Sequence, residues 1–187
     1  MLSNIGKMLQ QPERGFSSIN MANESFIVDG DETEGSEQIV QQFFAAIQEQ
    51  DTEVVRHMLV EHRSLLTRAR CKAKGASFPA EVERDAFTLL GAYLGPLTGL
   101  QLAILTGKDS VAKDILDSTF EQDVDAKFGN GNTALHLAVL LGASTMVSVL
   151  IERGADTTIK NKRGYSAVDM SDNPDILNLL HQPGDEE

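Results

Sequence analysis

The chain has 187 residues, 41% of them hydrophobic, which is enough to form one sizeable buried core. Its formal net charge of −12 argues against a general binder of nucleic acid or of anionic membranes. A single cysteine, Cys71, excludes an internal disulfide and a multi-cysteine metal site, and it fits a reducing compartment.

Targeting and membrane signals are weak throughout the sequence. No apolar run reaches the roughly 18 residues of a membrane span, and the first residues lack the apolar core of a secretory signal. We therefore expect a cytoplasmic or nuclear protein without a membrane partner.

Residues 1–38 are rich in Ser, Asn, Glu and Gly, and only the stretch SFIV, residues 25–28, is apolar. Such a segment cannot bury enough surface to offset its ordering entropy, which predicts a mostly disordered acidic arm. SFIV is interpreted as an isolated apolar spot in that arm, and the alternative is a strand that joins a partner or docks in a groove.

From Ile39 onward the apolar residues recur at helical spacing, in two runs separated by a short break. The first run is Val40, Phe43, Phe44 and Ile47, and the second is Val54, Val55, Met58 and Leu59. This pattern predicts two short helices joined by a tight turn. A similar pair begins at Thr133.

The second pair belongs to an internal repeat. Gly131 recurs as Gly164 after 33 residues, and the stretch GNTALHLAVLLGASTMVSVLIERGAD, residues 131–156, resembles the ankyrin repeat, with Ala134 in place of the usual Pro. LTGLQLAILTGKDSVAKDIL, residues 97–116, aligns with it at a constant offset of 35. AAIQEQDTEVVRHML upstream and GYSAVDMSDNPDILNLL downstream match in register.

The resemblance implies an all-α ankyrin-repeat solenoid of helix-turn-helix units over about residues 39–181. Four repeats are expected at about 39–62, 96–128, 129–161 and 162–181, with an insertion at about 63–95 and an acidic tail at 182–187. Each repeat alone would be unstable, since its apolar face must be covered by its neighbours.

The repeat also assigns structural roles to its motif residues. Thr98 and Thr133 precede helical runs and are expected to cap them, and the family's pattern gives His136 the role of linking neighbouring repeats. Gly107, Gly142 and Gly154 are expected to end helices in left-handed conformation. The pair Gly129 and Gly131 is a turn, because no Gly-Lys-Ser/Thr follows to make a phosphate loop.

No catalytic set, metal-ligand spacing or cofactor fingerprint stands out. We predict a non-enzymatic protein-binding module without a cofactor: a small adaptor or regulatory or assembly subunit, monomeric on its own. Its partner is another protein whose identity the sequence does not give. Binding of nucleic acid is not expected.

In ankyrin arrays the partner surface comprises the hairpin tips and the concave face. Carried over to this sequence, it comprises Leu105, Thr106, Gly129, Asn130, Asn132, Leu140, Leu141, Lys162, Arg163 and Tyr165. Leucines at three such positions would form an exposed apolar patch. The alternative, weighed equally, is that the insertion or the N-terminal arm covers them.

The insertion combines a basic segment with an expected helix. The basic segment contains Arg63, Arg68, Arg70, Lys72 and Lys74. It offers an alternative function, the binding of phosphorylated or nucleic-acid partners, although a solvated loop is the simpler interpretation. Cys71 among these cations would be a redox site only if it were exposed. AEVERDAFTLLGAYLGP predicts a helix that ends near Gly95 and packs on the second repeat.

Overall fold

The computed structural model describes residues 25–27, 35–72, 78, 80–91, 94–118 and 122–181. These residues form two compact units. The first, here called the N-unit, comprises the described residues of 16–77 and 94–123, and the second, the C-unit, comprises those of 78–93 and 124–187. The predicted insertion is therefore not one structural element, because its two halves belong to different units.

The N-unit begins with the two helices that the periodicity predicts, α2 (Ser36–Glu49) and α3 (Thr52–Glu61). Gln50 joins them with a φ of 60°, in the left-handed region where glycine is the usual residue. Asp51 caps α3, since its Oδ1 accepts a hydrogen bond from the Val54 backbone N–H at 3.1 Å.

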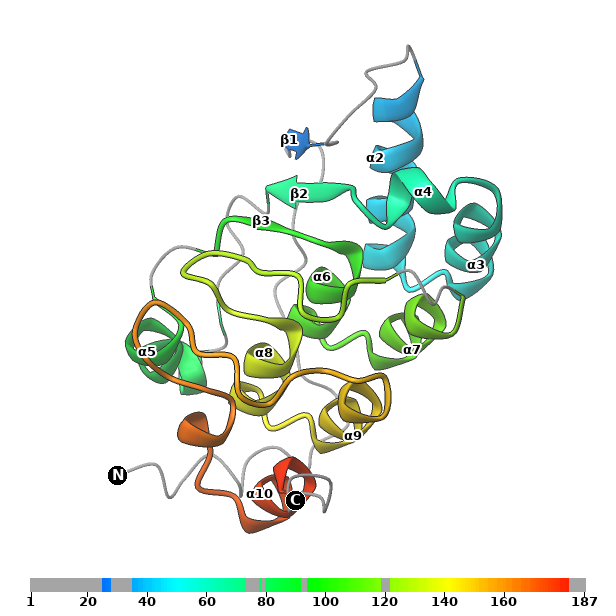
Figure 1. Ribbon diagram of the computed structural model, residues 1–187. Coiled ribbons are helices and arrows are strands. Elements are labelled where there is room, and N and C mark those ends of the chain that lie inside the picture. Colours follow the sequence, from blue (N-terminus) through cyan, green and yellow to red (C-terminus); the bar gives the residue numbers. More distant parts are fainter. Residues whose placement is uncertain are drawn as a thin grey trace. The chain divides into compact units, whose positions relative to one another are not determined.

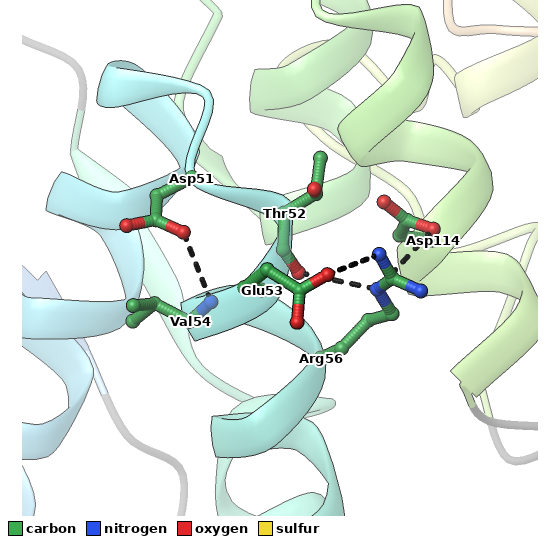
Figure 2. Close-up of polar contacts among 6 residues, drawn as sticks. All are labelled: Asp51, Thr52, Glu53, Val54, Arg56 and Asp114. Carbon is green, nitrogen blue, oxygen red and sulfur yellow. Dashed lines mark hydrogen bonds and ion pairs between the residues drawn. The ribbon is translucent and has the colours of Figure 1, made fainter.

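A second hairpin, α6 (Gly99–Leu105) and α7 (Asp109–Ser118), packs on the first. α6 contacts α2 and α7 contacts α3. Gly99 permits the first contact, because a Cβ there would lie 2.7 Å from Cε1 of Phe43. On α3, Arg56 contacts Glu53 at 2.9 Å and Asp114 of α7 at 3.7 Å (Figure 2).

A short helix, α4 (Arg63–Leu66), leads into a small sheet with strand order β1-β2-β3. β2 (Arg70–Lys72) pairs antiparallel with β1 (Ser25–Ile27) on one side and β3 (Pro96–Leu97) on the other (Figure 1). β1 is the SFIV segment, so the interpretation of SFIV as an isolated spot in a disordered arm was wrong for these three residues. Phe26 anchors the strand, since its ring stacks on Phe44 of α2 with centroids 5.6 Å apart.

The C-unit contains α5 (Ala80–Leu89), α8 (Ala134–Leu140), α9 (Ser144–Glu152), the 3-10 turn η2 (Val168–Met170) and α10 (Pro174–Leu180). α8 packs on α9, on η2 and on α5, and α9 packs on α10. Helices dominate the described chain, so the predicted all-α class is confirmed despite the three short strands.

The expected insertion helix exists as α5, with two corrections. It ends at Leu89 instead of near Gly95, because Gly91 adopts a φ of 93°. It packs on α8, which belongs to the third predicted repeat and not to the second. Sequence distance gave the wrong neighbour, since α5 precedes the second repeat by only a few residues.

Candidate protein interface

The turn before each of α6, α8 and η2 is closed by a side chain three residues after a Thr or Ser, namely Thr98, Thr133 and Ser166. At α6, Gln101 Oε1 accepts from the Thr98 backbone N–H at 3.0 Å, and Thr98 Oγ1 accepts from the Gln101 N–H at 3.2 Å. At η2, Asp169 Oδ2 accepts from the backbone N–H and the hydroxyl of Ser166 at 2.8 and 2.6 Å. These bonds lower the pKa of Asp169, with the Ser166 hydroxyl as the largest cause.

His136 closes the equivalent turn before α8 and also reaches beyond it. Its Nδ1 accepts from the Thr133 backbone N–H at 3.2 Å, and its Nε2 lies 3.1 Å from the Tyr165 carbonyl oxygen. This geometry requires the neutral tautomer with the proton on Nε2. Burial lowers the pKa of His136 and so favours that neutral form, although the Tyr165 carbonyl opposes the shift.

Three glycines of the repeat motif stand in the left-handed region. Gly107, Gly142 and Gly154 have φ values of 68°, 63° and 84°. The N–H of Gly107 donates to the carbonyl of Ile104, and those of Gly142 and Gly154 donate to Val139 and Ile151. Each glycine therefore lies just beyond a helix end, where a side chain would add strain.

The hairpin tips of the C-unit hold the end of α5 through three asparagines, the asparagine cluster Asn130, Asn132 and Asn161. The side-chain amides of Asn130 and Asn132 both donate to the Leu90 carbonyl at 3.1 Å. That of Asn161 donates to the Leu89 carbonyl at 2.9 Å and to Asn132 Oδ1 at 2.8 Å. The unpaired carbonyls that any helix has at its C-terminus thus find donors here.

Two further contacts tighten this junction. Arg163 Nη1 donates to the Thr88 carbonyl at 3.1 Å, so a third carbonyl near the end of α5 has a donor on a hairpin tip. A Cβ at Gly91 would overlap the side-chain amide of Asn130, which leaves glycine as the residue that fits. Specific hydrogen bonds therefore hold the end of α5 against the two hairpin tips.

This arrangement changes the predicted partner surface. Asn132 is fully buried, Asn130 and Gly129 are partly buried, and the two asparagine side chains are bonded to α5. Lys162 and Arg163 are exposed and Tyr165 is partly buried. The sequence does place asparagines in both hairpin tips, but it gives no sign of the carbonyls that they bind.

The predicted exposed leucine patch does not exist. Leu105, Leu140 and Leu141 are each 2% exposed. Thr106 is also buried, and its hydroxyl donates to the Leu102 carbonyl at 2.8 Å. All seven residues of α8 are buried, with α5, α9 and η2 packed around the helix. The alternative that the insertion covers this face is the one that holds for α8.

The predicted basic segment lies on α4 and β2 in the N-unit, where Arg63, Arg68 and Lys72 are exposed and Arg70 is partly buried. Lys74 lies outside the described residues. Arg68 Nε donates to the Ser64 carbonyl at 2.9 Å, so part of that guanidinium is engaged. Cys71 is fully buried, which removes the exposed thiol that a redox site needs.

Within the described residues, no group of three or more metal-ligating side chains comes together. None of the described helices combines the length and apolarity needed to cross a membrane. The repeated hairpins with reciprocal caps, a bridging histidine and left-handed glycines are therefore the most informative features.

Sequence comparison decides their family. Residues 115–171 match the family model described as "Ankyrin repeats (many copies)". Residues 115–171 of this chain therefore carry ankyrin repeats. Ankyrin repeats generally mediate protein–protein interaction, and proteins related through them are typically non-enzymatic interaction modules.

Three relatives illustrate the range of the similarity. This chain is 43% identical over 51 residues to human Ankyrin repeat domain-containing protein 29. That match covers 27% of this chain and 17% of the relative. The chain is 50% identical over 40 residues to human Palmitoyltransferase ZDHHC17, a match that covers 21% of this chain and 6% of the relative. Ankyrin repeat domain-containing protein OPG023 of Cowpox virus (strain Brighton Red) is 35% identical over 68 residues. That match covers 33% of this chain and 10% of the relative.

The matched segments are thus a small part of each relative, 6 to 17% of its length. They concern the repeats and carry over no activity or partner of the whole proteins.

Proposed function

We propose that this protein is a non-enzymatic adaptor or assembly subunit whose protein partner docks on the outer face of α5. The observation that carries the proposal is Phe87. Its side chain is 59% exposed, and no other aromatic residue in the described part of the chain is exposed. Large aromatic side chains are enriched at the centres of protein interfaces and often dominate binding energy.

The support beneath Phe87 is rigid. Ala86, Leu89 and Leu90 are buried beside it, and the asparagine cluster fixes the end of the helix. A side chain presented from a fixed helix loses little conformational entropy on binding. The insertion helix thus replaces the hairpin tips as the presented surface, since it occupies them.

The charges around Phe87 favour a partner with acidic residues at the border of the contact. Arg84 lies three residues earlier on α5 and is exposed. Lys162 and Arg163 are exposed on the tip that binds Thr88, and Glu83 is the exposed acid among the described side chains of α5. Rim charges of this kind mainly affect the association rate and the choice of partner.

The proposal includes a cytoplasmic or nuclear location and a chain that is monomeric until it meets its partner. Two point variants of the full chain test it. Phe87→Glu should abolish capture of the partner in affinity purification with mass spectrometry, while Val60→Glu should leave it intact. Val60 is a matched control, since it is 69% exposed on α3.

A photo-crosslinking residue at position 87, compared with one at position 60, provides the direct measurement. We expect one protein to cross-link to the residue at position 87 and not to the residue at position 60. Equal capture by both variants, with helical circular dichroism unchanged, would refute α5 as the interface.

A further inference from the structure

A second surface, independent of α5, lies at the edge of the small sheet in the N-unit. β1 forms that edge with only three residues, Ser25, Phe26 and Ile27, paired with Lys72, Cys71 and Arg70 of β2. Phe26 and Ile27 are both partly buried and not fully covered. A strand this short contributes little free energy, so we expect it to separate from the sheet more easily than the helices do.

β1 covers groups that need a replacement when it leaves. The backbone N–H and C=O groups along that edge of β2 would lose their partners, which makes them a template for another strand. Phe44 is fully buried partly by the Phe26 ring, and it also packs edge-on against Phe43 at 5.5 Å. An extended segment with an aromatic side chain in the Phe26 position would restore both kinds of contact.

The charges of β2 indicate what else the segment carries. Arg70 and Lys72 alternate with the buried Cys71, and the exposed Arg68 precedes them. Arg70 Nη1 is buried and has no hydrogen-bond partner in the described part of the chain, while the residue opposite Arg70 on β1 is the apolar Ile27. A carboxylate suits an unsatisfied guanidinium well.

The antiparallel register sets the position of that carboxylate. A segment bound as β1 is would run past Arg70 toward Arg68 after its aromatic residue. Acidic residues that follow the aromatic side chain would therefore meet the basic end of β2. The chain's own sequence has this order, since SFIV is followed by Asp29, Asp31 and Glu32.

We propose that the outer edge of β2 is a docking site for an extended segment of a partner protein in which acidic residues follow an aromatic side chain. In this proposal β1 is the chain's own competitor, which partners must displace. The site goes beyond the α5 interface, lies in the other unit and does not involve Phe87, so either proposal can fail without the other.

The test uses the full chain and a fluorescent peptide of residues 22–33, ANESFIVDGDET. Anisotropy should report binding to Phe26→Ala about tenfold tighter than to wild type, because the weakened β1 leaves the edge open more of the time. Phe87→Ala is the matched aromatic control and should bind like wild type. A peptide with Ala in place of its phenylalanine should lose most of its affinity.

The electrostatic part has its own prediction. Adding Arg70→Gln and Lys72→Gln to Phe26→Ala should lower the affinity for the peptide several-fold. Raising the salt concentration should have the same effect on a chain that retains Arg70 and Lys72. Hydrogen exchange on wild type gives a readout that does not depend on any variant's folding. Exchange at residues 25–27 should be much faster than in α6, and saturating peptide should slow exchange at residues 70–72.

Equal affinity of wild type and Phe26→Ala for the peptide would overturn the proposal, as would exchange at residues 70–72 that the peptide does not change. A concentration-dependent dimer of the wild-type chain, built by reciprocal exchange of β1, would also overturn it. In that case the occupant of the edge is a second copy and not a partner protein.

Discussion

The turns before α6 and α8 have the same capping geometry and use different residues, Gln101 and His136, so an amide oxygen and a ring nitrogen can each serve as the acceptor. In the N-unit, Gln101 accepts from the Thr98 backbone, within its own turn. In the C-unit, His136 makes the equivalent bond to Thr133 and also reaches the Tyr165 carbonyl, 29 residues away. Both side chains are 1% exposed.

The second contact continues into the junction with α5. The Tyr165 carbonyl also accepts from the Asn161 backbone N–H at 2.9 Å, and Asn161 in turn donates to the end of α5. His136 therefore fixes the hairpin that holds the proposed interface helix. An acceptor three residues after the cap is the general requirement, and at His136 the link to the next hairpin is made by the second ring nitrogen.

The largest expected effect is the same in both units, because it concerns buried leucines of α6 and of α8. Leu105→Glu and Leu140→Glu each place a carboxylate in a fully covered site and should destabilise by more than about 4 kcal/mol. Denaturant unfolding followed by circular dichroism measures the loss. Phe87→Glu is the control and should retain its stability; a folded Leu140→Glu chain would mean that this leucine is not core.

The next effect concerns the histidine cap. His136→Ala should cost about 2–3 kcal/mol, because the variant loses a cap and a bond between hairpins. His136→Gln retains a possible cap and should fall between wild type and His136→Ala. Equal losses for His136→Ala and His136→Gln in urea unfolding would show that the capping bond adds nothing.

The pH dependence of stability provides a smaller effect, present only where histidine is the capping residue. Burial lowers the pKa of His136 in the folded state, so the unfolded chain binds its proton first as the pH falls. Stability from this group is complete above its ordinary value of 6.5 and decreases below it. The free energy of unfolding should fall between pH 7 and 5 by less in His136→Gln than in wild type.

Two carboxyl groups with a lowered pKa, those of Asp156 and Asp169, do not obscure that window. Hydrogen bonds lower the pKa of Asp156, with the Thr158 hydroxyl first, and that of Asp169, with the Ser166 hydroxyl first. Their contributions are lost only as the pH falls through and below their ordinary value of 3.8. An identical pH profile for His136→Gln and wild type would contradict the assignment.

The smallest expected effect concerns the exposed edge of the α5 junction. Arg163→Ala removes one solvent-accessible hydrogen bond and should cost less than about 1 kcal/mol, whereas Asn161→Ala breaks a buried cluster and should cost about 2 kcal/mol. Hydrogen exchange in α5 is the sensitive measurement. It should rise strongly in Asn161→Ala and slightly in Arg163→Ala, and the opposite order would place the main anchor at Arg163.

Several features were predictable because they depend on local patterns. Helical spacing from Val40 to Leu59 gave α2 and α3, and the TALH stretch gave both the family, now confirmed, and the cap at Thr133. The same patterns failed to predict whether a residue is buried by an element that is distant in the sequence. Leu140 has the same sequence signal whether a neighbouring helix covers it or leaves it exposed.

The sequence by itself determined the ankyrin-repeat pattern, the helix pairs and the turns that need glycine, because each follows from residues close together in the chain. Only the tertiary structure decided that β1 joins β2, that α5 packs on α8, and that the asparagine cluster binds its carbonyls. These contacts join residues about 40 or more positions apart, such as Phe26 and Cys71 or Leu90 and Asn132. Backbone carbonyls and strand edges offer the same partners at every residue, so no side-chain pattern names the one that is used.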